Sequence, residues 1–207
     1  MIDLEAEFGP IDIYLFDQLL RGRIRPGMRV LDAGCGQGRN LVYLLKAGYD
    51  VSGLDADAGA IAAIRHRAAS VAPQLPPTNF RQETLQASTF PDHGADVVLS
   101  SAVLHFARDD ADFDGMLQGT WRLLKPGGLF FCRLASVIGM ESRMRPLGGR
   151  RFALPDGSER YLVDEALLIE LTRRLGARLL DPLKTTVVQD QRCMTTWVAQ
   201  KDLRPRE

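Results

Sequence analysis

Residues Val30–Asn40, with the sequence VLDAGCGQGRN, decide the fold predicted for this chain. The apolar residues at their start follow the breaker pair Pro26-Gly27, a pattern that predicts the end of a buried strand. Three alternating glycines come next, and then leucines at helical spacing, Leu41, Leu44 and Leu45. A strand, a glycine-rich turn and a helix open the α/β units that bind nucleotide-like ligands, because glycine lets a ligand approach bare backbone. The alternative is a tight strand-to-helix turn without a ligand.

The spacing of the glycines narrows the class of ligand that the turn could bind. They occupy alternate positions, Gly34, Gly36 and Gly38, whereas a dinucleotide-binding turn would need a glycine where Arg39 stands. Asp32 lies at the carboxyl end of the predicted strand, just before the turn. A carboxylate there repels a pyrophosphate but favours a cationic ligand, such as one that carries an ammonium and a sulfonium group. The turn therefore favours a cationic cofactor over a dinucleotide.

The sequence DAGCGQG at residues 32–38 resembles motif I of the class I S-adenosylmethionine-dependent methyltransferases. Two later stretches are also similar to that family: Ser100–Phe106 to motif IV, where methyl group and acceptor meet, and Trp121–Gly128 to an architectural turn. The resemblance implies an α/β fold with a doubly wound, mostly parallel seven-stranded sheet, Rossmann-like, that finishes with a terminal antiparallel strand. It also implies S-adenosylmethionine as the cofactor and in-line transfer of its methyl group to a small acceptor.

Within the family, the pattern of residues 34–51 resembles the tellurite-resistance-type small-molecule methyltransferases. Members of that group carry a His-Arg pair before the last strands, where this chain has only Arg192. The substrate of that group is therefore not carried over to this chain.

A second carboxylate follows the next predicted strand, residues 50–54. Asp55 lies about 20 positions after the first glycine, the spacing at which a second-strand carboxylate meets a ribose, and it can accept hydrogen bonds from both hydroxyls. Asp57 competes for this role, but it fits better as the N-cap of a helix at residues 58–71.

In the family an acidic residue after the third strand approaches the adenine. The third strand is predicted at residues 79–85, and Glu83 is the nearest match; the alternative is a solvated loop glutamate. The cofactor-binding residues that we predict are Asp32, Gly34, Cys35, Gly36, Gly38, Asn40, Asp55, Ala56, Glu83, Thr84, Ser100 and Ser101.

His105, in the stretch that resembles motif IV, is the candidate general base, because the unperturbed pKa of histidine lies near neutrality. A base is needed only if the acceptor binds in its protonated form, and the alternative is that His105 merely packs beside the cofactor. Cys35 fits a small side chain packed under the cofactor better than a nucleophile. Cys132 and Cys193 fall within predicted strands and fit core positions.

The acceptor is predicted to be a small anion. Between Gly139 and Leu154 stand four arginines (Arg143, Arg145, Arg150 and Arg151) against one acidic residue, Glu141, in a chain with no net charge. In the family this segment commonly contributes to the substrate pocket, and arginine suits oxyanions because its guanidinium binds them in a forked geometry. The alternative is a solvated basic loop. The substrate-side residues that we predict are Tyr14, Arg133, Arg150 and Arg151; Tyr14 is alternatively a core residue of an N-terminal helix.

Composition sets limits on class and location. The 207 residues are 45% hydrophobic, and the 26 basic side chains balance the 26 acidic ones, so nothing global points to nucleic acid or membrane. No apolar run reaches the ~18 residues of a membrane-spanning helix, and the acidic N-terminus does not resemble a signal peptide. Three unpaired cysteines favour a reducing, cytoplasmic compartment. No spacing of ligands predicts a metal site, and we expect a monomer or a homodimer.

The chain is predicted to form a single domain, residues 1–207, divided along its length. An N-terminal helical cap at 1–25 precedes the cofactor-binding core at 26–135. A substrate-side insertion at 136–163, rich in glycine and proline, leads to a C-terminal helix and a pair of strands (178–188 and 193–200) within 164–201, followed by a tail at 202–207. Two alternatives to methyl transfer stay open: a non-catalytic module that binds S-adenosylmethionine or serves as a scaffold, and a nicotinamide-dependent oxidoreductase.

Overall fold

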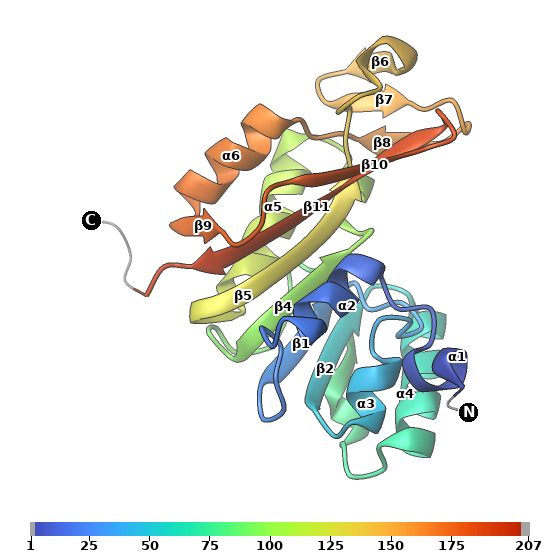
Figure 1. Cartoon of the computed structure of the whole chain (residues 1–207), viewed down its shortest axis with the longest axis vertical. Helices are drawn as coiled ribbons and strands as arrows, with labels where there is room; N and C mark the ends of the chain where they lie inside the picture. Colours follow the sequence, from blue (N-terminus) through green and yellow to red (C-terminus); the bar gives the residue numbers. More distant parts are fainter. Residues whose placement is uncertain (1–2, 204–207) are drawn as a thin grey trace.

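The computed structural model describes residues 3–203, and a twisted sheet runs through its centre (Figure 1). Its strands lie in the order β10-β11-β5-β4-β1-β2-β3, and a short strand, β9, pairs with β11. The pairs β4–β5, β1–β4, β1–β2 and β2–β3 are parallel, whereas β11 runs antiparallel to β5, β10 and β9. The predicted seven-stranded, mostly parallel sheet with antiparallel strands at one edge is confirmed. The strands are β1 (Arg29–Ala33), β2 (Asp50–Asp55), β3 (Phe80–Gln82), β4 (Ala95–Ser101), β5 (Leu124–Ala135), β9 (Ala177–Leu179), β10 (Lys184–Val188) and β11 (Arg192–Lys201).

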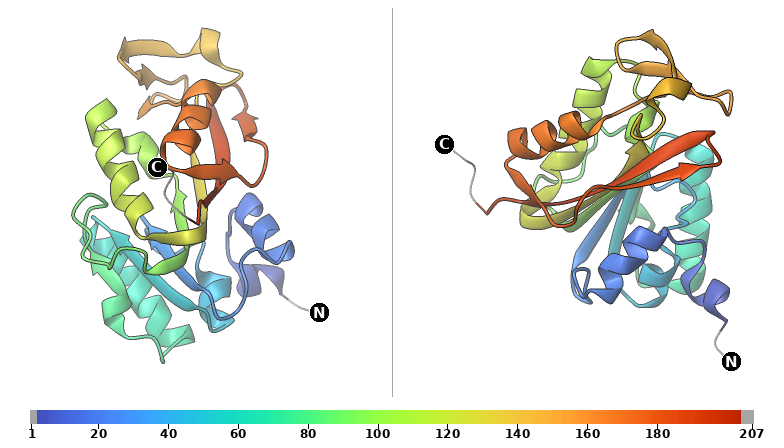
Figure 2. Two further views of the ribbon diagram at one scale, coloured as in Figure 1. Left: turned by 90° about the vertical axis from the view of Figure 1, so that its left-hand side faces the viewer. Right: turned by 45° about the horizontal axis from the view of Figure 1, so that its top comes forward.

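Helices cover both faces of the sheet (Figure 2). Residues of β4 alternate between the two hydrophobic clusters: Val97 and Leu99 pack with α2, α3 and α4, whereas Val98 packs with α5 and α6. A strand buried on both faces explains the near-continuous apolar run at residues 95–101. The helices are α1 (Leu4–Phe8), α2 (Ile13–Leu20), α3 (Val42–Lys46), α4 (Ala58–Val71), α5 (Asp110–Arg122) and α6 (Glu165–Arg174), with 3-10 turns at η1 (Pro77–Asn79), η2 (Leu104–Phe106) and η3 (Glu141–Arg143).

Aspartates begin the longer helices. The Asp57 carboxylate accepts a hydrogen bond from the Ala60 N–H at 2.6 Å, and Asp109 accepts one from the Asp112 N–H at 2.8 Å. Each bond satisfies an N–H that has no partner within its helix. The N-cap predicted for Asp57 is therefore confirmed, which separates its role from that of Asp55.

Two strands differ from the predictions at their ends. β5 begins at Leu124, within the turn expected at Trp121–Gly128, but its register with β4 passes from Ala95–Leu124 to Val97–Leu129, so Lys125–Gly128 have no partners in β4. Gly127 has φ +77°, so it accommodates this irregularity within the strand. The third strand is also shorter than predicted and ends at Gln82.

The predicted strand at residues 178–188 is two strands. β9 ends at Leu179 and β10 begins at Lys184, and between them Pro182 has no N–H to offer a sheet. The buried carboxylate of Asp181 accepts hydrogen bonds from Gln18 and Arg23, at 3.1 and 2.8 Å. These contacts hold the break against the N-terminal helix α2.

Residues 136–163 contain a small second sheet, drawn at the top of Figure 1. It consists of three antiparallel strands, β6 (Arg145–Gly148), β7 (Arg151–Ala153) and β8 (Glu159–Tyr161). The Arg151 guanidinium donates to the Ala107 carbonyl at 3.2 Å, and the Tyr161 hydroxyl donates to the Asp110 carboxylate at 2.8 Å. The insertion is thereby fixed to the loop that follows β4.

The C-terminal end of the described chain is held against the turn that follows α6. The Asp202 N–H donates to the Gly176 carbonyl at 2.8 Å. Of the predicted tail at 202–207, residues 204–207 lie outside the described part. No helix within residues 3–203 combines the length and the apolar character that crossing a bilayer requires.

Candidate functional site

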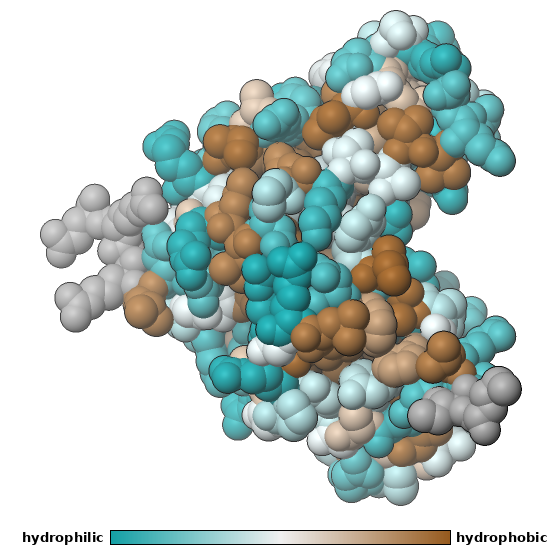
Figure 3. Space-filling view, viewed as in Figure 1, coloured by the Kyte–Doolittle hydropathy of each residue, from teal (hydrophilic) through white to brown (hydrophobic). Residues whose placement is uncertain are grey.

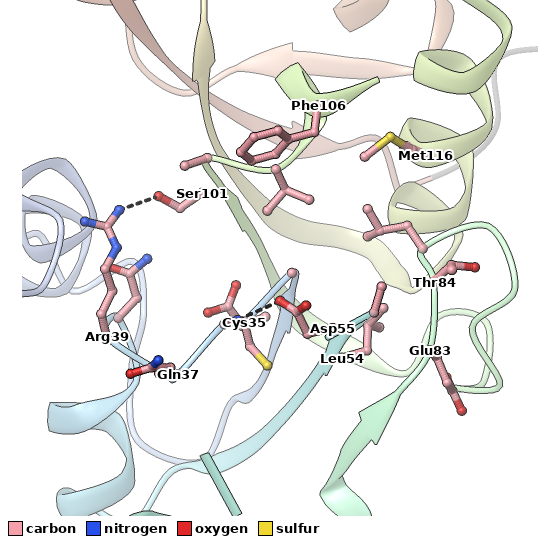
Figure 4. A pocket seen from close by; sticks show the side chains of 18 of the residues that line it. Cys35, Gln37, Arg39, Leu54, Asp55, Glu83, Thr84, Ser101, Phe106 and Met116 are labelled. Carbon is pink, nitrogen blue, oxygen red and sulfur yellow. Dashed lines mark hydrogen bonds between the residues drawn. The ribbon is translucent and has the colours of Figure 1, made fainter. Parts of the chain in front are cut away.

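The main cavity lies at the carboxyl edge of the parallel strands, where β1, β2, β3 and β4 end (Figure 4). It has a volume of about 620 Å³. We call it the glycine-turn cavity; it is lined by Asp32, Gly34, Cys35, Gly36, Gln37, Arg39, Asn40, Leu54, Asp55, Ala56, Glu83, Thr84, Leu85, Gln86, Ser101, Ala102, Val103, Phe106 and Met116. In doubly wound folds, ligands bind at this edge of the sheet.

The three glycines of the turn have different roles. A Cβ on Gly34 would lie 2.3 Å from the Val103 side chain, and one on Gly38 would lie 2.1 Å from Ile64. Both residues also have positive φ, +87° and +76°, which favours glycine at both positions. Gly36 has φ +51°, and a Cβ there would meet nothing within 4 Å. Gly36 therefore presents bare backbone to the open cavity, as the close approach of a ligand requires.

Asp55 is held at the rim of the glycine-turn cavity by two backbone groups. Its Oδ2 accepts a hydrogen bond from the Gly36 N–H at 2.8 Å, and its Oδ1 accepts one from the Asp57 N–H at 2.9 Å. The carboxylate at the end of β2 thus fixes the glycine turn at the end of β1. Neighbouring Ala56 also lines the cavity.

Asp32 lines the glycine-turn cavity and has a buried carboxylate oxygen without a partner in the described part of the chain. The residue is 2% exposed, and its Oδ1 has no hydrogen-bond partner among the described residues. Burial raises the pKa of Asp32 to about 7, although the nearby positive charge of Arg39 acts in the opposite direction. Such an oxygen fits a cationic or hydrogen-bond-donating group of a ligand.

Cys35 and Asn40 have structural roles beside the glycine turn. Burial raises the pKa of the Cys35 thiol, and the side chain packs so closely that a Cβ on Gly53 would lie 3.0 Å from it. A protonated, packed thiol is not an activated nucleophile. The Asn40 Oδ1 accepts a hydrogen bond from the Asp12 N–H at 3.0 Å, which attaches the N-terminal segment to the turn.

The predicted residues at the ends of β3 and β4 fall into two groups. Thr84 and Ser101 line the glycine-turn cavity, and the Ser101 Oγ accepts a hydrogen bond from Arg39 at 3.2 Å. Glu83 also lines it, but its carboxylate accepts hydrogen bonds from the N–H and hydroxyl of Thr89, and Figure 4 shows its side chain directed away from the middle of the cavity. Ser100 is fully buried and does not line the cavity.

A second pocket of about 300 Å³ adjoins the first and shares Arg39 and Ala102 with it. Ala102 has φ +64°, an uncommon conformation for a residue with a side chain, at the point where the two spaces meet. Figure 3 shows the molecule indented between the insertion and the N-terminal helices. We call this second space the arginine pocket; it is lined by Arg39, Ala102, His105, Arg133, Ala135, Leu154, Asp156, Ser158, Arg160, Val188, Arg192 and Met194.

His105 lies in the arginine pocket and not in the glycine-turn cavity. It is 5% exposed, and its Nδ1 accepts a hydrogen bond from the Ala135 N–H at 3.1 Å. Burial lowers the pKa of His105 to about 4, and the charge of Arg160 acts in the same direction. The ring is therefore neutral at physiological pH.

The predicted substrate-side residues do not gather in one place. Arg133 lines the arginine pocket and forms an ion pair with the buried Asp12 at 2.8 Å. Tyr14 lies nearby, 5.9 Å from the Arg133 guanidinium to the ring centre, with its hydroxyl 3.0 Å from Thr186. Arg150 pairs with Asp164 at 2.9 Å and Arg151 with Glu159 at 3.2 Å, and neither lines the glycine-turn cavity or the arginine pocket.

Sequence reasoning missed the arginines that line the pocket instead, Arg39, Arg160 and Arg192. Arg39 stands inside the quoted glycine stretch, where its position after the last glycine was the available signal. Arg160 comes from β8 and Arg192 from β11, and no local pattern connects these two residues. Within residues 3–203, no three His, Cys, Asp or Glu side chains are grouped in a way that could hold a metal ion.

A parallel sheet covered by helices on both faces, with a glycine turn and acidic residues at its carboxyl edge, defines a Rossmann-like cofactor-binding protein. The model of a family described as "Methyltransferase domain" matches residues 31–132. A probable S-adenosylmethionine-dependent methyltransferase from Mycolicibacterium smegmatis is 30% identical over 76% of this chain and 54% of its own length. The ubiquinone biosynthesis O-methyltransferase of Ruegeria pomeroyi is 31% identical over 80% of this chain and 66% of its own.

Solved structures agree on the fold. A methyltransferase from Methanosarcina mazei superimposes with a TM-score of 0.70 at 21% identity, covering 90% of this chain and 98% of that one. TehB from Haemophilus influenzae superimposes with a TM-score of 0.68 at 21% identity, covering 93% and 63%. The chain belongs to the S-adenosylmethionine-dependent methyltransferases. It spans about half to two thirds of the length of the curated relatives named here.

Proposed function

We propose that this protein transfers the methyl group of S-adenosylmethionine to a small anionic acceptor bound in the arginine pocket. The observation that carries the proposal is the common wall of the two spaces, formed by Arg39 and Ala102. Because the two spaces meet at these residues, an acceptor in the arginine pocket lies next to a cofactor in the glycine-turn cavity. Adjacent spaces of this kind suit a transfer between two bound molecules.

The cofactor is assigned to the glycine-turn cavity through the chemistry of its lining. The unpartnered Asp32 oxygen suits the ammonium group, the open backbone at Gly36 suits close approach, and Asp55 suits the ribose hydroxyls. Bound S-adenosylmethionine supplies a methyl group already activated by its sulfonium. The protein's own residues hold the two reactants in line and exclude water, and positioning of this kind supplies ~7–11 kcal/mol in favourable cases.

The charge of the arginine pocket supports an anionic acceptor. Four arginines line it against one carboxylate, Asp156. Asp12 pairs with Arg133, whereas Arg160 and Arg192 have no carboxylate oxygen within 4.0 Å among the described residues. Guanidinium groups that face a pocket without a close ion pair are well suited to bind a carboxylate or another oxyanion.

Oxygen is the accepting atom that we propose. The relative from Ruegeria pomeroyi is named as an O-methyltransferase, and an oxyanion is the group that the arginines would bind. Residence in the cytoplasm and a monomeric or homodimeric state stay predictions. The nicotinamide alternative loses its support with the family assignment.

The test is turnover of isotopically labelled S-adenosylmethionine on a panel of small carboxylic and hydroxy acids, each paired with its neutral amide. We expect label in one or more acids and none in the matching amides. Transfer to amides or amines alone would contradict the anionic acceptor. Cofactor binding without transfer to any member would instead favour the alternative of a non-catalytic binding module.

A further inference from the structure

The Nδ1 nitrogen of His105 accepts a hydrogen bond from the protein backbone. The Ala135 N–H donates to Nδ1 at 3.1 Å, so the lone pair of Nδ1 is occupied and this nitrogen carries no proton. A neutral imidazole has one N–H, which must then lie on Nε2. The bond also satisfies the buried amide of Ala135 at the end of β5.

The surroundings keep this tautomer neutral. The charged groups around the ring are Arg160 from β8, Arg133 from β5, and, across the pocket, Arg39, Arg192 and Asp156. On the neighbouring helix α5, the Asp110 carboxylate is already bound by the Tyr161 hydroxyl. Burial and the positive charge of Arg160 both disfavour an imidazolium, in line with the lowered pKa of His105.

Like His105, the carboxylates in and beside the arginine pocket are unsuited to accept a proton from the acceptor. Asp156 accepts hydrogen bonds from the Ser158 N–H and hydroxyl, at 3.0 and 2.6 Å. Although burial acts to raise the pKa of Asp156, these bonds and the charge of Arg192 outweigh it and leave the pKa lowered. Asp32, Asp55 and Glu83 line the glycine-turn cavity only. Within the described residues, the arginine pocket thus holds no free base.

We propose that the acceptor enters as an oxyanion, with its accepting oxygen already unprotonated, and that His105 is a hydrogen-bond donor to it through Nε2 rather than a general base. This inference rests on the proposed function. An oxygen lone pair forms the new O–C bond while the C–S bond breaks and its electron pair stays on sulfur. The products are the methylated acid and S-adenosylhomocysteine, and no proton is released. A small carboxylic acid, fully ionised at neutral pH, meets this requirement, and its second oxygen is free to accept the bond from His105.

The tautomer can be tested without knowing the acceptor. Imidazole ¹⁵N spectra of the full chain with S-adenosylhomocysteine should show the His105 proton on Nε2, with no titration between pH 5.5 and 8.5. The exposed His66 provides a control signal in the same spectra. A proton on Nδ1, or titration of His105 near neutrality, would overturn the proposal.

The proton balance tests the chemistry. With the first acid that turns over in the panel, an indicator in weak buffer should register no proton for each S-adenosylhomocysteine formed. Release of one proton per turnover would refute the ionised acceptor. Absence of turnover with every acid would contradict the proposed function, while the spectra would still decide the role of His105.

Two variants separate donor from base. His105→Gln keeps a side-chain donor and acceptor, whereas His105→Phe keeps neither. We expect His105→Gln to retain kcat within about threefold and His105→Phe to raise the acceptor KM about tenfold, with the dependence of kcat on pH at saturating S-adenosylmethionine the same in both variants as in the wild type. A loss of 10²–10⁴-fold in kcat for His105→Gln, the usual worth of a general base, would overturn the proposal, provided that S-adenosylhomocysteine still binds.

Discussion

The glycine-turn cavity and the arginine pocket share a wall but are built in opposite ways. The first is formed where the parallel strands β1, β2, β3 and β4 end, from the short segments at residues 32–40, 54–56, 83–86 and 101–106. The second draws one arginine each from the glycine turn, β5, β8 and β11. In the first, backbone conformation places the functional groups; in the second, tertiary packing of distant segments does. The comparison teaches that cofactor binding depends on a local motif and acceptor choice on the assembly of the whole chain.

The largest effect is expected from Gly36→Val. A branched side chain there would fill the open space of the cavity and force an L-residue into a left-handed conformation, at a cost of ~1–2 kcal/mol. We expect the affinity for S-adenosylhomocysteine to fall at least 100-fold in calorimetry. Gly48→Val is the matched control, because Gly48 has φ +75° and open space but lines neither site. Equal loss of affinity in both variants would show that strain, not the cavity, is responsible.

The next effect concerns the rim of the same cavity. Asp55→Ala should weaken cofactor binding by about 1.5–3 kcal/mol, the worth of charge-assisted hydrogen bonds, and it also releases the Gly36 N–H. Asp57→Ala is the control: loss of its N-cap should cost ~1 kcal/mol of stability but leave the affinity unchanged. If calorimetry gave Asp55→Ala the affinity of the wild type, Asp55 would have no part in the site.

A smaller effect is expected in the arginine pocket. Arg192→Ala and Arg160→Ala should each raise the acceptor KM about tenfold while the affinity for S-adenosylhomocysteine stays constant. Arg150→Ala removes an arginine paired with Asp164 outside the pocket and should change neither quantity. Steady-state kinetics that ranked Arg150→Ala with the other two would reinstate the basic loop as the acceptor site.

A separate effect, on stability rather than on binding, is a pH dependence that comes from Asp32. Its pKa rises from 3.8 to about 7 on folding, so between these values the folded protein holds one more proton than the unfolded chain. The free energy of unfolding should therefore fall as the pH rises from about 4 to 7, and Asp32→Asn should remove that part of the slope. Thermal unfolding of the cofactor-free proteins at pH 5 and pH 8 measures the difference.

The same carboxylate should make cofactor binding depend on pH. Most of the Asp32 population is protonated at pH 6 and ionised at pH 8, so the affinity for S-adenosylmethionine should be several-fold higher at pH 8. Asp32→Asn should lose this dependence. Parallel pH profiles for the two proteins would mean that Asp32 does not face the cofactor's positive charge.

Local patterns predicted what local forces determine. The bounds of α4 and the N-cap at Asp57 follow from periodicity and capping, and the structure confirms them. The insertion strands β6–β8 have weak periodicity because their residues are mostly exposed or half-buried, so no buried face marks them. Arg192 reaches the pocket because β11 pairs antiparallel with β5, with Met194 opposite Ala135, and a pairing of this kind between distant segments leaves no trace in either segment alone.

Arg39 has a thermodynamic consequence, since one guanidinium lines both spaces. Its charge acts on Asp32 on one side and faces the acceptor on the other. A cofactor whose positive charge neutralises Asp32 changes the electrostatic environment of Arg39, which also faces the acceptor. The binding constants of cofactor and acceptor are therefore coupled. Such coupling is reciprocal: whatever factor the cofactor applies to the affinity of the acceptor, the acceptor applies to the affinity of the cofactor.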